Sequence, residues 1–330
     1  MGRTMRAQRG IVLVLVLLLV ALLVVVVGQL CYTTAVDRSM AEGTLEEAQV
    51  ALAMASGIEH ARALLEADAG SERGWDAPGE PWSRPFRRTV GVVVVDGAMS
   101  DAEARWHLYW LAAPAPAGRD VAVELGRALA EHDGRPDGAT VARSLVAWFA
   151  GAPPFPEAAT RELEGRAPPA APLVSMSELA MLEGVEAGAV HGAGSGERSA
   201  TLDRVLTIWG SGRINLNSAS APVLASLDER LAGSLARSIV DRREEASDGS
   251  VARPYESVEA LAEVPGMNDP IGEAPAGGKA PTLYGLVKDR VTVTSTAFTL
   301  ELVARGPRLE RRARVVLVRD RGTVTVASYE

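Results

Sequence analysis

The sequence predicts an α+β fold that combines a long N-terminal transmembrane helix, an antiparallel sheet and a large inserted α-helical domain. Three observations lead to this prediction. An apolar run at residues 11–27 continues into a segment with helical spacing, β-branched and aromatic segments precede residue 114, and further β-branched segments follow residue 285. The residues in between have mainly helical spacing, so we expect the sheet to be completed after a long helical excursion.

The apolar run from Ile11 to Val27 contains seventeen consecutive apolar residues. A helix of this length spans roughly 26 Å, near the lower limit for crossing a bilayer. A secretory signal peptide is the alternative, but its apolar region is usually about 7–15 residues long and precedes a small-residue cleavage site. Only Thr33–Ala35 offers a weak site of this kind, so retention as an anchor is favoured. Because three arginines precede the run, the rest of the chain is expected outside the cytoplasm.

Helical spacing continues beyond the anchor. Apolar residues recur at intervals of three or four and are expected to form one buried stripe: Ala51, Met54, Ile58, Ala61 and Leu65. Gly70 is a suitable stop. The pattern favours a single helix over residues 11–70, although an anchor, a linker and a separate helix would have a similar pattern.

The charge balance argues against a polyanion as partner. The chain has 34 Lys and Arg against 42 Asp and Glu, a net charge of −8. Without Arg3, Arg6 and Arg9 the net charge is −11, whereas binding to phosphates requires excess cationic groups. The single cysteine, Cys31, excludes an internal disulfide.

Two early segments are predicted to be strands: the valine-rich Thr89–Gly97 and the aromatic Arg105–Ala113. Residues 121–182 then become helical, and their expected core is apolar: Val123, Leu125, Leu129, Leu145, Val146, Trp148 and Leu179. From residue 286 onward, alternating and β-branched residues between turn signals predict three or four antiparallel strands.

Residues 213–267 have the pattern of short helices joined by tight turns. Ser218 or Ser220 can cap the first helix, and Pro222 fits its first turn. Further apolar positions follow at helical spacing, and Ser257 can begin a third helix. This pattern indicates a helix-hairpin-helix-like module.

Four features, in this order, resemble the general secretion pathway protein K (GspK) family of type II secretion minor pseudopilins. Arg9-Gly10 precedes an apolar helix, as at a prepilin peptidase site. Further along, Ser175–Leu179 resembles the family's S-E-L segment, with Ser177, Glu178 and Leu179. The segment Gly212–Leu227 then resembles the family's signature G-x-I-N-x-N-x-A-S-x-x-x-L, with Ile214, Asn215, Asn217, Ala219 and Ser220. Finally, Ser295–Phe298 resembles the S-x-x-F strand of its closing sheet. The resemblance is weakest across residues 71–170.

The resemblance implies that a prepilin peptidase cleaves between Gly10 and Ile11 and that Ile11 becomes the methylated N-terminus. Other pseudopilins carry glutamate at the fifth mature position, which is Leu15 here, and K-type members commonly lack it. A carboxylate in lipid is costly unless it meets a partner charge. A subunit with no neighbour above it therefore gains nothing from this glutamate.

The resemblance also implies a function. The chain is expected to be a non-enzymatic minor pseudopilin at the tip of the type II secretion pseudopilus. It would cross the inner membrane once, with a cytoplasmic N-terminus and a periplasmic soluble domain. The implied partners are other minor pseudopilins, the major pseudopilin and the prepilin peptidase.

No cofactor is predicted. Some members of the family bind calcium, but the segment around Trp148 lacks their carboxylates, so no calcium ligands are assigned. A separate acidic cluster is better explained as a solvated helix end than as a cation site; it comprises Asp241, Glu244, Glu245 and Asp248.

The expected organisation has five parts. They are a leader peptide at residues 1–10, the membrane and pilin helix at 11–70, the first part of the sheet domain at 71–113, the inserted helical domain at 114–285 with the module at 213–267, and the closing strands at 286–330.

Two other classes of protein fit less well. Helix-hairpin-helix modules also occur in membrane-anchored DNA-uptake proteins, but the hairpin at Leu227–Leu231 has two acidic residues and no glycine pair. Residues 213–265 contain six arginines against nine acidic residues, so nucleic acid is not expected as a partner. An enzyme is disfavoured because no nucleophile motif is present and the histidines lie far apart without metal-ligand spacing: His60, His107, His132 and His191. The tryptophans are expected to serve as packing residues, with Trp75 and Trp82 as candidates for partner contact.

Overall fold

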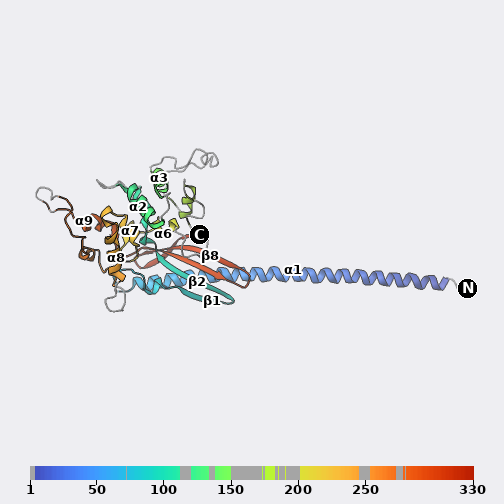
Figure 1. Cartoon of the computed structure of the whole chain (residues 1–330). Helices are drawn as coiled ribbons and strands as arrows, with labels where there is room; N and C mark the ends of the chain where they lie inside the picture. The colour runs from blue at the N-terminus through green and yellow to red at the C-terminus, as the bar shows by residue number, and fades with distance from the viewer. Residues whose placement is uncertain are drawn as a thin grey trace. The chain divides into compact units, whose positions relative to one another are not determined.

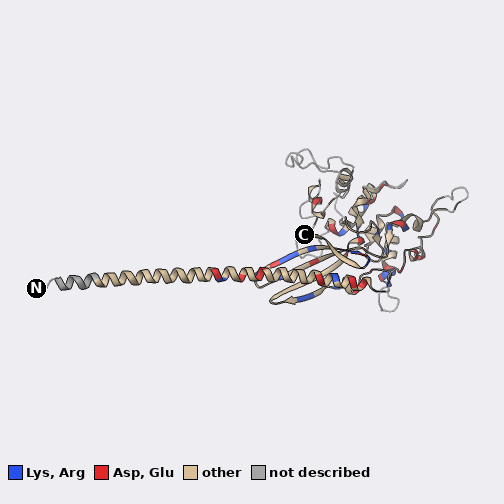
Figure 2. Ribbon diagram, turned by 180° about the vertical axis from the view of Figure 1, so that it is seen from behind, with Lys and Arg blue, Asp and Glu red and all other residues tan. Residues whose placement is uncertain are grey.

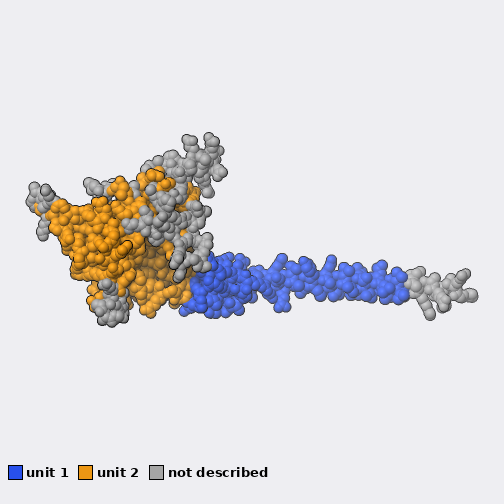
Figure 3. Space-filling model, in the orientation of Figure 1, with its two compact units in different colours: residues 1–56, 87–96, 303–312 blue, residues 57–86, 97–302, 313–330 orange. Residues whose placement is uncertain are grey.

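The computed structural model describes residues 4–71, 73–111, 120–133, 138–149, 173, 175–182, 185, 190, 201–244, 253–272, 278 and 280–330. The chain divides into two compact units, which Figure 3 colours separately. Unit 1 comprises residues 1–56, 87–96 and 303–312, and unit 2 comprises residues 57–86, 97–302 and 313–330.

A single helix, α1, extends from Thr4 to Ala69 without interruption (Figure 1). This agrees with the predicted continuous helix and not with an anchor joined to a separate helix. Gly28 and Gly43 both lie inside it, and a Cβ at either position would meet no neighbouring atom. Each glycine costs a helix about 1 kcal/mol relative to alanine, and α1 continues through both of them.

The buried stripe of α1 begins at Val50, one residue before the predicted start at Ala51. It comprises Val50, Ala53, Met54, Gly57, Ala61 and Leu65, whereas Ala51 is exposed and Ile58 is only half-buried. Each residue turns the helix by about 100°, so a stripe that begins at Val50 leaves Ala51 on its flank. The predictions for Met54, Ala61 and Leu65 are confirmed.

Five strands form the main sheet in the order β1-β2-β7-β8-β9. Their bounds are Phe86–Val90, Val93–Asp101, Ala297–Arg305, Glu310–Asp320 and Thr323–Tyr329. Strands β2 and β7 are neighbours although the whole helical region separates them in sequence. The α+β class, with a sheet completed after a long excursion, is therefore confirmed.

The predicted strand Thr89–Gly97 is wrong, because a hairpin turn divides it. Strand β1 ends at Val90 and β2 begins at Val93, with Gly91 and Val92 between them. Gly91 has φ = +61°, which suits the first central position of a type II′ turn. The adjacent valines concealed this turn in the sequence.

The predicted strand Arg105–Ala113 is also wrong over most of its length. Only β3 (Trp106–His107) is extended, and the 3₁₀ helix η3 (Leu108–Leu111) follows at once. Strand β3 pairs in parallel with β4 (Leu206–Thr207). Residues 112 and 113 lie outside the described residues.

The sheet contains three closing strands, β7, β8 and β9, where three or four were predicted. Strands β8 and β9 pair antiparallel. Arg321 and Gly322 connect them with positive φ of 47° and 85°, as a type I′ turn requires. In unit 2, α1 caps the edge of β9, because Arg62 Nε donates to the Val324 carbonyl at 3.0 Å. The short β6 (Val291–Thr292) lies outside this sheet and pairs in parallel with β5 (Ile214–Asn215).

The region between β2 and β7 is mainly helical. Its α-helices are α2 (Val121–Asp133), α3 (Gly138–Phe149), α6 (Leu202–Val205), α7 (Ala221–Ala225), α8 (Ser234–Glu244) and α9 (Leu283–Val287). Its 3₁₀ helices are η2 (Ala102–Ala104), η3, η4 (Met176–Met181), η5 (Glu229–Leu231), η6 (Val258–Glu263) and η7 (Lys288–Arg290). One further 3₁₀ helix, η1 (Pro81–Ser83), precedes the sheet.

A continuous hydrophobic core holds these helices together within unit 2. Leu125, Leu129, Leu145, Trp148 and Leu179 are buried in it, as predicted, while Val146 is half-buried. The prediction that Val123 belongs to the core is wrong, since this side chain is 53% exposed. Val121, Leu125 and Ala128 form the buried stripe of α2, which places Val123 on the opposite side.

The segments α7, η5 and α8 follow in the order that a helix-hairpin-helix module requires, and η6 begins after Ser257. Ser220 is the N-cap residue of α7 and a proline occupies the first turn. The assignment of residues 213–267 to that module, and the five-part organisation of the chain, stay predictions.

Candidate functional site

The predicted signature residue Asn215 lies where the inserted region meets the start of the closing sheet. It is fully buried at the end of β5. Strand β5 pairs with β6, so that Ile214 lies opposite Val291 and Asn215 opposite Thr292. This two-residue pairing places the Asn215 side chain beside the segment that leads into β7.

The Asn215 amide joins three segments that are remote in sequence. Its Nδ2 donates to Asp101 Oδ2 at 2.8 Å, to Ser295 Oγ at 2.9 Å and to the Asp76 carbonyl at 3.1 Å. Its Oδ1 accepts from the backbone N–H of Asn217 at 2.9 Å. Asp101 ends β2 and Ser295 precedes β7, so one side chain connects both points where the excursion leaves and re-enters the sheet.

Asn217, the second signature asparagine, makes a similar connection within the helical region. Its Nδ2 donates to the Tyr255 carbonyl at 3.0 Å, and its Oδ1 accepts from the Tyr255 N–H at 2.7 Å. The Tyr255 hydroxyl in turn donates to the carbonyl of Ile239 on α8. Asn217 thus holds the loop after α8 against the segment before α7.

Glu103 is a second buried junction that sequence reasoning missed. Its carboxylate accepts from the backbone N–H and the hydroxyl of Ser211, at 2.9 and 2.7 Å. It also accepts from the N–H and hydroxyl of Thr296, at 2.9 and 2.6 Å. Gly210 has φ = +113°, and a Cβ there would lie 2.5 Å from Glu103 Cγ, so this close approach requires glycine.

Arg319 near the end of β8 completes the arrangement. Its guanidinium contacts Asp68 at 2.8 Å and Asp76 at 2.6 Å, and it donates to the Ser295 carbonyl at 2.8 Å. It also stacks over Phe298, 5.0 Å from the ring centroid. Together with the groups above it forms what we call the polar hub: Asp68, Asp76, Asp101, Glu103, Asn215, Ser295 and Arg319.

Burial perturbs two carboxyl groups of the polar hub. Complete burial raises the pKa of Asp101 to about 6, although hydrogen bonds to it act in the opposite direction. Burial, followed by the nearby Glu80 carboxylate, also raises the pKa of Asp68 to about 6, and Arg319 opposes this shift. Both groups therefore take up a proton more readily than exposed aspartates do.

The carboxylates of Asp68, Asp76 and Glu80 offer ligand atoms within 4.8 Å of one another, which is the spacing of a cation site. The Arg319 guanidinium already contacts the first two. Glu80 Oε2 accepts from the Ala77 N–H and from Trp82 Nε1. Because a protein cation and internal donors occupy these oxygens, the set does not fit calcium.

Among the described residues, the predicted acidic cluster gives no further ligand set. Asp241 and Glu244 are exposed at the end of α8, and Glu244 lies 3.6 Å from Arg243. Glu245 and Asp248 lie outside the described residues.

The other predicted signature residues have structural positions. Ser175 and Glu178 form a capping box at the start of η4, and Leu179 is fully buried. Ile214 and Ala219 are fully buried as well. Ser177 donates its backbone N–H to the Ser175 hydroxyl. The Ser295–Phe298 segment supplies the hub serine and a buried phenylalanine that packs edge-on against Trp82, at 5.0 Å between centroids.

Trp82 is therefore a core residue and not a candidate for partner contact.

Among the histidines, His60 is half-buried and packs edge-on against Phe86. His107 is buried, and burial lowers its pKa to about 4. The side chains of His132 and His191 are not among those described. The described histidines thus show packing and no shared site.

The predicted membrane anchor corresponds to the N-terminal half of α1. Figure 2 shows a long stretch of this helix without Lys, Arg, Asp or Glu. Among the described residues it is the one helix long and apolar enough to cross a membrane, with a mean hydropathy of 3.2 in its most apolar window. Gly10 and Ile11 lie within α1, and their role in processing stays a prediction.

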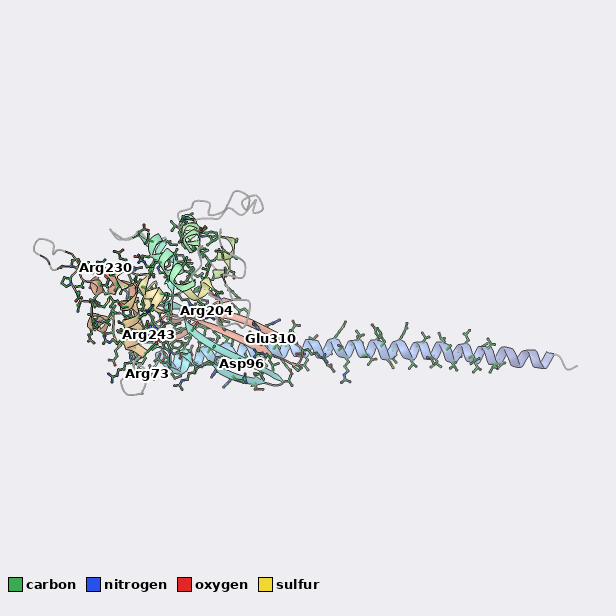
Figure 4. All side chains as sticks on the ribbon, in the orientation of Figure 1. Arg73, Asp96, Arg204, Arg230, Arg243 and Glu310 are labelled. Carbon is green, nitrogen blue, oxygen red and sulfur yellow. The ribbon has the colours of Figure 1, made fainter. Side chains whose placement is uncertain are left out.

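Unit 1 contains a second group of charged contacts, all of them between exposed or half-buried groups. Arg305 lies 2.6 Å from Asp96 and 3.1 Å from Glu310, two residues labelled in Figure 4. On α1, Glu46 accepts from the backbone N–H groups of Arg308 and Leu309, at 2.6 and 2.9 Å. These contacts fasten the β7–β8 turn to the helix.

Comparisons with known proteins agree with the predicted resemblance. Residues 214–279 match the family model described as Type II secretion system (T2SS), protein K. This segment begins at the signature residue Ile214 and includes both asparagines. A sequence comparison with curated proteins finds no match.

The fold is similar to that of a chain in the crystal structure of the GspK-GspI-GspJ complex from the enterotoxigenic Escherichia coli type 2 secretion system. The TM-score is 0.63 at 17% identity, over 88% of this chain and 98% of that chain. Because identity is low, this likeness establishes the shared fold alone. The matched segment and the shared fold together confirm the resemblance of this chain to the type II secretion protein K family.

Proposed function

We propose that this chain is a non-enzymatic minor pseudopilin at the tip of a type II secretion pseudopilus and supports protein secretion across the outer membrane. The observation that carries the proposal is the family match over residues 214–279. The asparagines of that segment are committed to internal hydrogen bonds, through Asn215 and Asn217. Asn215 connects the helical region with the sheet, and Asn217 connects two segments within the helical region; these are structural roles and not catalytic ones.

Placement at the tip rests on two features. Repeating subunits of a filament stack their globular parts at short intervals around a core of N-terminal helices, and the bulky excursion between β2 and β7 would obstruct a subunit above. Leu15 also stands where other pseudopilins carry glutamate, so this subunit lacks the charge that would pair with a neighbour above it. Both features suit a position with free space on one side.

The proposed partners are other minor pseudopilins in a tip complex, together with the major pseudopilin and the prepilin peptidase. The similar solved structure is a complex of three such proteins, which supports this proposal. The proposed location is the inner membrane, with a single span, a cytoplasmic N-terminus and a periplasmic soluble part. No calcium role is proposed, because the described carboxylate set does not fit that ion.

Processing provides the first test. In cells with the cognate peptidase, intact mass should show loss of residues 1–10 and a methyl group on Ile11. A mature chain that begins at or after Thr33 would instead indicate an ordinary signal peptide. Deleting the gene should trap secreted proteins in the periplasm, and normal secretion by the deletion strain would contradict the proposed role.

The alternative is a membrane-anchored DNA-binding protein. In the hairpin after α7, Asp228 accepts from the Arg230 backbone N–H and pairs with the Arg230 side chain at 2.8 Å. A carboxylate thus occupies the position where a DNA-binding hairpin would offer backbone amides to phosphate. We expect no measurable affinity for duplex DNA at physiological salt; sub-micromolar binding that weakens with salt would support the alternative.

A further inference from the structure

The polar hub in unit 2 opens to solvent through a cavity of about 280 Å³, which we call the hub cavity. Its inner part is formed by Asp68, Asp76 and Arg319, whose side chains are at most 12% exposed. The remaining lining comes from the loop after α1, the segment before β7 and the β8–β9 turn. The outer part of this cavity contains side chains that hold no other part of the fold in place.

Arg321 lines the outer part in a backbone conformation that arginine rarely adopts. It begins the β8–β9 turn with φ = +47° and is, among the described residues, the only one besides glycine with a positive φ. Glycine, asparagine and aspartate are preferred at this position of the turn. The Arg321 side chain is exposed, and its guanidinium has no ion pair or hydrogen bond within the described part of the chain. The turn therefore does not require an arginine and is strained by it.

Arg73, labelled in Figure 4, supplies a second cation to the same cavity. Its side chain is 50% exposed, and its ion pair with Glu80 is long, at 3.4 Å. The Arg73 guanidinium lies over the Trp75 ring, 5.9 Å from the centroid. Trp75 is half-buried, packs against the hydrophobic core and also lines the cavity. The outer part thus combines two exposed guanidinium groups with an indole ring.

The charges of the cavity favour a ligand with a single negative charge. In the inner part, Arg319 contacts both Asp68 and Asp76, so this part has one negative charge in excess when both carboxylates are ionised. The two exposed guanidinium groups attract an anion, but the excess charge behind them repels a doubly charged phosphate more strongly than a carboxylate. Guanidinium groups also match the planar shape of a carboxylate. The indole ring offers an apolar surface beside it.

We infer that the hub cavity binds a carboxylate that stands beside an apolar side chain of a partner polypeptide. Arg73 and Arg321 hold the carboxylate, and the apolar group packs on Trp75. The volume of about 280 Å³ lies at the lower end for ligand pockets and suits one or two residues. The carboxylate has two possible sources: the C-terminus of a chain that ends in an apolar residue, or an internal glutamate next to an apolar residue.

The test uses the full chain in detergent micelles, with fluorinated tryptophan in place of tryptophan. Fluorine NMR follows the Trp75 signal, which is assigned by its loss in Trp75→Phe. N-acetyl-leucine represents the C-terminal source, and N-acetyl-glutamyl-leucinamide represents the internal source. At least one of these two probes should shift the Trp75 signal saturably, and the tighter binder identifies the source. N-acetyl-leucinamide, which lacks a carboxylate, and inorganic phosphate should cause no saturable shift.

Variants separate binding from folding. Arg321→Gly and Arg73→Gln should each weaken binding of the effective probe by about tenfold, because each removes a charge-assisted hydrogen-bond donor. The thermal midpoint of Arg321→Gly should equal or exceed that of wild type, because glycine suits the turn. The matched control is Arg88→Gln, which removes an exposed arginine of β1 and should bind within twofold of wild type.

Three results would overturn the inference. The first is the absence of a saturable shift with both carboxylate probes. The second is equal binding by Arg321→Gly and wild type, or a lower thermal midpoint of this variant, which would show that the fold itself requires the arginine. The third is binding of inorganic phosphate as tight as that of the carboxylate probes, which would indicate a general attraction of anions.

Discussion

The charged groups of unit 1 are exposed to water, whereas those of the polar hub in unit 2 are buried. In unit 1, Arg308 pairs with Glu42 at 3.1 Å, and their side chains are 62% and 43% exposed. In the polar hub, Arg319 pairs with Asp76 at 2.6 Å, and the exposed fractions are 12% and 3%. The two regions thus use the same residue types with different access to water.

The difference indicates which contacts can change and which cannot. Exposed ion pairs contribute little to stability and are screened by salt. Breaking a buried network leaves an unpaired charge or polar group without water, which is costly. The polar hub therefore fixes the helical region to the sheet, whereas the exposed ion pairs of unit 1 contribute little to its stability.

The largest expected effect comes from removing the Arg319 charge. Arg319→Gln leaves Asp68 and Asp76 without their cation, so the free energy of unfolding should fall by about 3 kcal/mol at pH 7.5. Because the pKa of Asp68 is already raised to about 6, protonation relieves part of this repulsion as the pH falls. The loss should therefore be smaller at pH 5.

Urea unfolding followed by tryptophan fluorescence can measure this effect, since all six tryptophans lie in unit 2. Arg319→Lys is the matched control, because it retains the charge but not the guanidinium geometry, and it should lose less. Equal losses for Gln and Lys, or a loss independent of pH, would contradict the role assigned to this charge.

The next effect concerns the signature asparagine. Asn215→Ala removes all four hydrogen bonds of this side chain and leaves the Asp76 carbonyl and the buried Asn217 N–H without this partner, so unfolding free energy should fall by about 2–3 kcal/mol. Asn268→Ala removes one exposed bond to the Ala262 carbonyl and should have little effect. The same urea titration compares them, and similar midpoints for the two variants would show that Asn215 does not secure the hub.

A smaller effect is expected from His107, whose pKa is lowered to about 4 by burial. The unfolded chain binds this proton near pH 6.5, so His107 destabilises the fold as the pH falls from 7 to 5, by about 2 kcal/mol. The raised pKa values of Asp68 and Asp101 act in the opposite direction, because stability from those groups is lost as the pH rises through 6.

His107→Asn retains an acceptor for the Tyr109 N–H and removes the titration. The free energy of unfolding of the variant minus that of wild type should be about 2 kcal/mol higher at pH 5 than at pH 7. Unfolding titrations at the two pH values provide the measurement. Parallel pH profiles for variant and wild type would mean that His107 takes up a proton as readily in the folded chain as in the unfolded chain.

The smallest effect belongs to unit 1. Arg308→Gln removes the exposed ion pair with Glu42. It retains the backbone N–H that donates a hydrogen bond to Glu46. The thermal midpoint followed by circular dichroism should shift by no more than about 2 °C, and less in 0.5 M salt. If Arg308→Gln lowered the thermal midpoint as much as Arg319→Gln does in the same measurement, the contrast between the two regions would be removed.

The sequence allowed prediction of the features that depend on local pattern. The α1 helix followed from its apolar run and spacing, and the importance of Asn215 followed from a compact signature. The hairpin at Gly91 was missed because valines on both sides continue the strand pattern. Val123 was misplaced because spacing alone did not determine which side of α2 faces the core.

The partners of Asn215 could not be predicted, because they depend on the completed tertiary structure. Asp101 lies 114 positions from Asn215 in sequence, and Ser295 lies 194 positions from Asp101. Glu103 and Arg319 likewise have no neighbouring motif that marks them as buried. Only the closure of β2 against β7 brings these groups together.

We propose that this chain occupies the tip of a filament. The measurement that tests it most directly is the copy number of the chain in sheared filaments, determined by quantitative mass spectrometry against the major subunit. If the helical excursion obstructs stacking, as proposed, and Leu15 leaves the subunit without the pairing charge, the filament should contain one copy of this chain. A copy number comparable to that of the major subunit would contradict tip placement.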